Sequence, residues 1–128
     1  MSGAKAVGER ANAVAWTEIP VTDMDRARAF YADVLQAELT IEEGGPNPMA
    51  MLPYAGGVGV SGHLYPGKPA PEGSGSTVHL AVPEAIERTM ERVRTAGGQV
   101  VSEAITISAG RFFYALDPDG NSIGFFES

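Results

Sequence analysis

Apolar and polar positions along the chain predict one strand, one helix and three further strands in its first half. Residues 12–21 alternate as a strand, and residues 23–36 carry apolar side chains at helical spacing. Thr22 is the expected N-cap of this helix, with Asp25 three residues later. Shorter segments then predict strands over 38–42, 49–52 and 58–63. The predicted order is therefore βαβββ.

The same order begins again after a loop. Residues 65–75 combine three prolines with three glycines and show no period, which is typical of a linker. A helix is expected over 84–96, ending at Gly97-Gly98. Residues 111–128 predict a hairpin, because the segment Asp117 to Asn121 is rich in turn-forming residues. The two remaining strands are expected over 77–82 and 99–103.

The two halves of the sequence can be aligned as an internal repeat, with two slightly different offsets in residue number. Val21 corresponds to Val82, a shift of 61 residues (82 − 21), which also places Glu18 on His79. Pro53 corresponds to Pro118, a shift of 65 (118 − 53). The second module is therefore expected to carry about four extra residues before its last strand.

Composition narrows the class of protein. A chain of 128 residues predicts a single domain, with a flexible lead-in over 1–11, module one over 12–64, a linker over 65–75 and module two over 76–128. The net charge of -7 argues against nucleic acid and anionic membranes as partners. The chain has no cysteine, and no apolar run approaches the roughly 20 residues of a membrane span. Without an apolar signal core, a cytoplasmic location is expected.

Three segments resemble one known group of proteins: Ile19 to Leu35, Val82 to Val101 and the DPDGN stretch from Asp117 to Glu127. They are similar to the vicinal oxygen chelate superfamily, which contains glyoxalase I, bleomycin-resistance proteins, fosfomycin-resistance enzymes and extradiol dioxygenases. This resemblance implies an α+β fold with two βαβββ modules that form a curved, cup-like mixed sheet with helices outside. It further implies ligand binding in the cup and a homodimer.

The resemblance also indicates where a metal would be bound. Metal-dependent members carry His, Glu or Gln on the first strand of each module and another ligand, usually Glu, on the last. The matching positions here are Trp16, Thr77, Gly124 and, on or near it, Gly59. Because tryptophan, threonine and glycine are poor metal ligands, the resemblance predicts no metal and no other cofactor.

Polar side chains near these positions are the remaining candidates. Glu18 and His79 lie two residues further along the two first strands, and both are expected to face the cup and approach each other. Such a pair could satisfy itself, contact a ligand, hold a displaced metal or act as acid and base. Trp16 could stack on a flat ligand or fill the cup as core. His63 is expected at a solvated strand end.

The sequence therefore predicts a glyoxalase/bleomycin-resistance-like protein that binds a small molecule without a metal. The expected ligand-binding residues are Trp16, Glu18, Thr77 and His79, and the acidic composition suits a cationic ligand. The alternative is a lyase, isomerase or dioxygenase with a displaced divalent metal at Glu18 and His79. A third hypothesis is a dimeric accessory protein that binds no small ligand.

Overall fold

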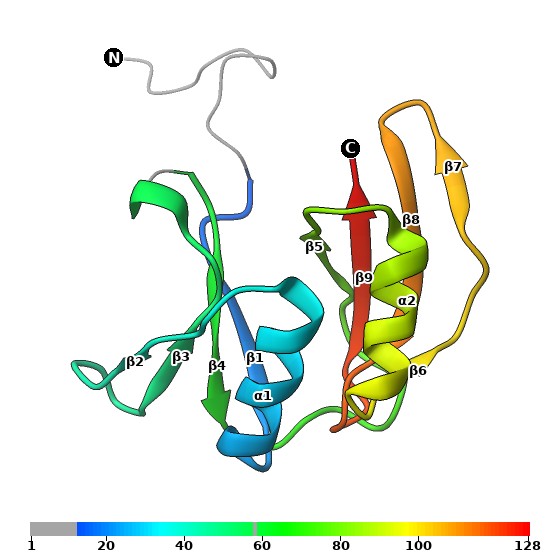
Figure 1. Ribbon diagram of the computed structural model, residues 1–128. Coiled ribbons are helices and arrows are strands. Elements are labelled where there is room, and N and C mark those ends of the chain that lie inside the picture. The colour runs from blue at the N-terminus through cyan, green and yellow to red at the C-terminus, as the bar shows by residue number, and fades with distance from the viewer. Residues whose placement is uncertain (1–12, 58) are drawn as a thin grey trace, which may run out of the picture.

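The computed structural model describes residues 13–57 and 59–128 (Figure 1). The predicted lead-in over 1–11, the first residue of the first predicted strand and Val58 lie outside this part. In the described part, no helix has both the length and the apolar character that a membrane crossing requires.

The first module forms a four-stranded mixed sheet in the order β1-β4-β3-β2, where β1 and β4 are parallel and the other pairs are antiparallel. Helix α1 follows β1 directly, as the apolar periodicity predicts. A short 3₁₀ turn over Ala55–Gly57 precedes the last strand. The elements are β1 (Thr17–Val21), α1 (Met24–Leu35), β2 (Ile41–Glu42), β3 (Met49–Met51) and β4 (Gly62–Pro66).

The second module repeats this arrangement around the order β5-β9-β8-β6. A further strand, β7, pairs with β8 where the sequence predicted only a connection. The α+β fold with two repeated modules is thus confirmed, with the strands divided between two mixed sheets. The elements are β5 (Val78–Ala81), α2 (Ile86–Thr95), β6 (Gln99–Val100), β7 (Ile105–Ile107), β8 (Gly110–Leu116) and β9 (Ser122–Glu127).

Outside the closing hairpin, the predicted strands are shorter in the structure or shifted along the chain, because a strand exists only where a neighbour pairs with it. The first begins at Thr17, whose N–H donates to the Ser61 carbonyl at 3.2 Å. The segment 38–42 is a strand only at its last two residues. The largest correction concerns β4, which occupies Gly62–Pro66 instead of 58–63.

Helix α1 is capped by a different residue from the one predicted. Asp23 is the N-cap, and its side chain accepts a hydrogen bond from the Arg26 backbone N–H at 3.0 Å. Thr22 instead donates to the carboxylate of Asp119 in the second module. The predicted apolar stripe is confirmed, with buried side chains at Ala27, Phe30, Tyr31, Val34 and Leu35.

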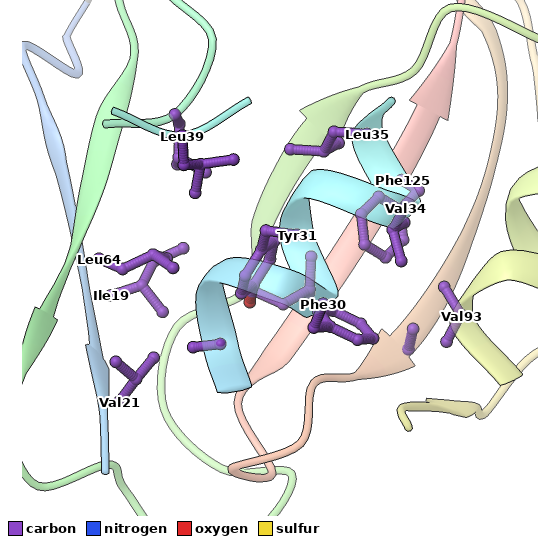
Figure 2. Close-up of a cluster of buried hydrophobic side chains, with 14 of the residues drawn as sticks. Ile19, Val21, Phe30, Tyr31, Val34, Leu35, Leu39, Leu64, Val93 and Phe125 are labelled. Atoms are coloured by element: carbon purple, nitrogen blue, oxygen red, sulfur yellow. The ribbon is translucent and has the colours of Figure 1, made fainter. Parts of the chain in front are cut away.

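A single hydrophobic core joins the two modules. Figure 2 shows Phe30, Tyr31 and Val34 on α1 between the side chains of the first sheet and those of the second module. Leu64 and Phe125, from the last strands of the two modules, are both fully buried. Both helices lie on the same side of the two sheets (Figure 1), so within residues 13–57 and 59–128 no helix covers the opposite strand faces.

The turn between β8 and β9 also fastens the modules together. The Tyr31 hydroxyl donates to buried Asp117 Oδ2 at 2.7 Å, and Asn121 Nδ2 donates to the Pro20 carbonyl at 2.8 Å. Asp119 accepts from Arg26 at 3.0 Å. Burial, followed by the nearby negative charge of Asp117, raises the pKa of Tyr31 well above its ordinary value. The turn that the sequence predicted therefore also connects the second module to the first.

Candidate functional site

A cavity of about 790 Å³ lies between the first strands of the two modules. Strand β1 and the residues just before it form one wall, and β5 with the residues just before it forms the other. All four predicted ligand-binding residues line this cavity: Trp16, Glu18, Thr77 and His79. Most of the remaining lining is apolar, with Leu35, Leu52, Val60 and Leu80 among its residues. The structure thus brings the candidates from both modules to one place.

Strand alternation places these side chains on the uncovered face. Ile19 and Val21 are buried in the core, whereas Glu18, which lies between Thr17 and Ile19, is exposed. In the second module, Leu80 packs against the core and His79 is exposed. The period of two in each first strand therefore explains why Glu18 and His79 both turn away from the helices.

Trp16 is held by a residue that the sequence analysis placed at a solvated strand end. Its Nε1–H donates to Nδ1 of His63 at 2.8 Å, and His63 is only 8% exposed. His63 lies on β4, beside Glu18 in the parallel pairing with β1. The prediction for His63 was therefore wrong: with β4 shifted, His63 lies inside the paired region of the sheet.

Glu18 is paired with His63 rather than with His79. Its Oε1 lies 3.7 Å from His63 Nε2, and its side chain is 64% exposed. Glu18 and His79 line the same cavity from different modules, so the structure brings the two residues to one site. Trp16, His63 and Glu18 therefore form a connected row on the first module.

His79 lies against aromatic rings and above a glycine. Its ring centroid is 5.2 Å from that of Phe112 and 5.6 Å from that of Tyr114, both edge-type contacts, with interplanar angles of 85° and 64°. A Cβ added at Gly124 would collide with His79 Nδ1. The absence of a side chain at Gly124 therefore leaves the space that the imidazole occupies.

Thr77 is engaged with the neighbouring strand. Its hydroxyl is 2.6 Å from the hydroxyl of Ser122, the first residue of β9. Either oxygen can donate in this pair; both hydroxyls keep acceptor capacity, and the accepting one also keeps its O–H donor. Thr77 offers the cavity a neutral hydrogen-bonding group.

The strand pairing moves one of the four metal-ligand positions. Glu18 pairs with His63 in the first module, and His79 pairs with Gly124 in the second. Each residue of the second pair lies 61 positions after its counterpart in the first (79 − 18 and 124 − 63). The last-strand position of module one is therefore His63. Gly59 lies in the preceding loop with a φ of 92°.

These four positions do not suit a metal. Trp16 uses its indole N–H as a donor to His63, Thr77 pairs with Ser122, and Gly124 has no side chain. Only His63 is a competent ligand, and its Nδ1 already accepts the bond from Trp16. In the described part of the chain, no three residues of the types His, Cys, Asp and Glu are grouped so that they could hold a metal ion.

Three further aromatic side chains lie beside the candidate residues; the sequence indicates Tyr54 and Tyr114 as possible walls of the cup, whereas Phe112 was missed. Tyr54 stands nearly perpendicular to Trp16, with ring centroids 5.2 Å apart. Phe112 and Tyr114 share the uncovered face of β8, whereas Phe113 between them is fully buried. Alternation in β8 could have indicated this division, but no local signal places Tyr54 beside Trp16.

Solved structures of other proteins share the fold. FosX, a fosfomycin resistance protein from Listeria monocytogenes, is 14% identical with a TM-score of 0.66, over 93% of this chain and 95% of the other. A glyoxalase/bleomycin resistance protein from Albidiferax ferrireducens is 19% identical with a TM-score of 0.63, over 91% and 99%. A glyoxalase I variant from Zea mays is 20% identical with a TM-score of 0.67, over 88% of this chain but only 46% of the other. At these identities, the similarity concerns the fold.

Sequence comparison identifies the family. No curated protein matches the chain. A family model described as the Glyoxalase/Bleomycin resistance protein/Dioxygenase superfamily matches residues 13–125. Because this match spans most of the sequence and agrees with the fold, the chain belongs to that superfamily, as its resemblance to vicinal oxygen chelate proteins implied.

Proposed function

We propose that this protein binds a small organic molecule in the cavity between β1 and β5, without a metal. The observation that carries the proposal is the cavity itself, since about 790 Å³ lies within the range of small-molecule sites. Its walls are mainly apolar, and Glu18, Thr77 and His79 supply a few polar groups from both modules. Such a site gains affinity from apolar contact and specificity from the polar groups.

The residues found at the metal-ligand positions support ligand binding rather than metal-dependent catalysis. Trp16 and His63 satisfy each other, and His79 lies above Gly124 where metal-dependent relatives carry a ligand. Glu18 and His63 are two possible ligands facing each other at 3.7 Å, which is the observation that favours the rival metal enzyme. In that rival, a divalent ion at this pair would serve a lyase, isomerase or dioxygenase reaction.

Two measurements on the full chain test the proposal. Calorimetric titration of chelator-treated protein with nickel, zinc, manganese and ferrous iron is expected to show no tight stoichiometric binding. A screen of small molecules, followed through the emission of Trp16, the only tryptophan, is expected to give saturable hits. Tight binding of one metal ion per chain would overturn metal independence and support the enzyme.

A matched pair of variants localises the hits. Ser76 lines the cavity, and Ser76→Phe would place a ring in it. Ser108 is exposed in the connection between β7 and β8, so Ser108→Phe is the control. The compounds that bind the parent are expected to bind Ser76→Phe at least tenfold more weakly, because the added ring occupies space that the ligand needs. Their affinity for Ser108→Phe is expected to equal that for the parent. Equal binding by both variants would show that the ligand is bound elsewhere.

A further inference from the structure

Few charge-bearing side chains line the cavity. Among its described lining residues, Glu18 is the one acidic side chain, and there is no lysine or arginine. An anionic ligand entering these walls would lose hydration and meet a carboxylate without a compensating lysine or arginine. The lining therefore discriminates against phosphonates, phosphates and carboxylates.

The Glu18 carboxylate is free to accept a ligand. Its side chain is 64% exposed, and the 3.7 Å to His63 Nε2 exceeds the usual length of a hydrogen bond. His63 lies beside the carboxylate and is itself buried and bonded to Trp16. A positively charged ligand group near Glu18 would gain an ion pair without displacing an existing strong one.

Trp16 offers its aromatic surface to the same region. Its one polar atom, Nε1, is already bonded to His63, so the indole has only its ring left for contact with a ligand. The ring of Tyr54 stands across it with an interplanar angle of 74°. Trp16 and Glu18 both line the cavity, and an indole face beside a carboxylate favours an organic ammonium group, because the ring face carries partial negative charge.

We infer that the ligand is an organic cation, with a quaternary or protonated amine held near Trp16 and Glu18 and an apolar body along the remaining walls. The inference rests on the proposed function and names its ligand class. Leu35, Leu52 and Leu80 line the part of the cavity that the body would occupy. The charge selects the ligand, and the leucine side chains contribute affinity.

Three probes of similar shape test the choice of charge. Benzyltrimethylammonium is the cation, neopentylbenzene is its neutral carbon isostere, and phenylacetate is the anion. Each is titrated into the full chain, with the emission of Trp16 and calorimetry as readouts. The cation is expected to bind about tenfold more tightly than the neutral isostere, and the anion more weakly than both.

Charge removal at Glu18 supplies the second test. Glu18→Gln keeps the side-chain shape and removes the carboxylate charge, and its exposure makes a folding defect unexpected. The variant is expected to lose about tenfold in affinity for the cation and nothing for the neutral probe. Glu42→Gln, at an exposed position on β2, is the control and is expected to behave as the parent. Far-UV circular dichroism confirms that both variants fold.

The outcomes separate the inference from the proposed function. Equal binding of the cation and the neutral isostere, or tighter binding of phenylacetate, overturns the cation class while small-molecule binding stands. A loss in Glu18→Gln that is the same for the charged and neutral probes overturns the role of its charge. Failure of all three probes, when the wider screen also gives no ligand, overturns both.

Discussion

A hydrogen bond to His63 holds Trp16, one of the residues that line the first wall of the cavity. The chain has one tryptophan, and its indole N–H is bonded to a buried imidazole. The bond assigns roles to both rings, since Nδ1 of His63 must carry a lone pair to accept it. Its other nitrogen, Nε2, then faces Glu18. His63 thus holds Trp16 by a hydrogen bond and lies beside Glu18.

Replacing His63 by leucine is expected to change the surroundings of Trp16. The indole N–H loses its acceptor, which should lower the free energy of unfolding by about 1–2 kcal/mol and shift the emission maximum. His63→Asn retains an acceptor oxygen near the position of Nδ1 and should restore much of the parent spectrum. Urea unfolding and Trp16 emission are the measurements. Spectra of both variants that match the parent would contradict the role given to His63.

Close contacts between strands decide where the site residues lie. Gly62, the first residue of β4, pairs with Thr17, and a Cβ at Gly62 would collide with the Thr17 carbonyl oxygen. Gly124 on β9 differs, because a Cβ there meets the side chain of His79. Backbone atoms in a paired strand cannot move alone, whereas an exposed side chain can adopt another rotamer.

The two glycines are therefore expected to respond differently to alanine. Gly62→Ala should lower the free energy of unfolding by about 2–3 kcal/mol, because β1 must separate from β4. Gly124→Ala should cost less than about 1 kcal/mol and instead displace His79 from Phe112 and Tyr114. Urea unfolding measures the first effect, and the NMR shifts of the His79 ring measure the second. A larger stability loss at Gly124 would contradict this account.

The whole molecule depends on contacts between its halves. The shared core and the turn between β8 and β9 hold the modules together, and the cavity exists only between them. Tyr31 lies at the centre of this junction, where its hydroxyl donates to Asp117. Asp117 also accepts from the backbone N–H groups of Asp119 and Asn121, so a single carboxylate orders the turn and links it to α1.

Tyr31→Phe is expected to weaken the junction by about 1–3 kcal/mol at neutral pH, because a buried hydrogen bond to a carboxylate is lost. The control is Tyr65→Phe, at a half-buried tyrosine on β4, which should cost less. Urea unfolding at pH 7 provides both values. A larger effect at Tyr65 would show that the junction does not depend on the Tyr31 hydroxyl.

Alkaline pH gives an independent test of the same residue. The pKa of Tyr31 is raised in the folded state, so its contribution is complete below about pH 10 and is lost as pH rises towards the folded pKa. The unfolded tyrosine ionises first, which favours unfolding. The parent should therefore lose up to about 1.4 kcal/mol per pH unit more than Tyr31→Phe above pH 10. Parallel pH profiles for the two proteins would contradict the raised pKa.

Local pattern was enough to predict the repeated modules, both helices and the closing hairpin. Apolar residues at helical spacing and the turn chemistry of Asp117 to Asn121 act over a few neighbouring residues, so the sequence expresses them directly. The same alternation indicated that Glu18 and His79 turn away from the core. Those features follow from backbone geometry and need no knowledge of distant partners.

Tertiary structure alone decided the register of β4 and the junction between modules. The connection before β4 covers 52–61, whereas the one before β9 covers only 117–121, so matching Pro53 to Pro118 misplaced the last-strand position on Gly59. Pairing with β1 puts His63 there instead. Register depends on hydrogen bonds between strands far apart in sequence, and loop punctuation does not encode it. For the same reason, only the folded chain shows that Trp16 is bonded to His63 and that Tyr31 reaches Asp117.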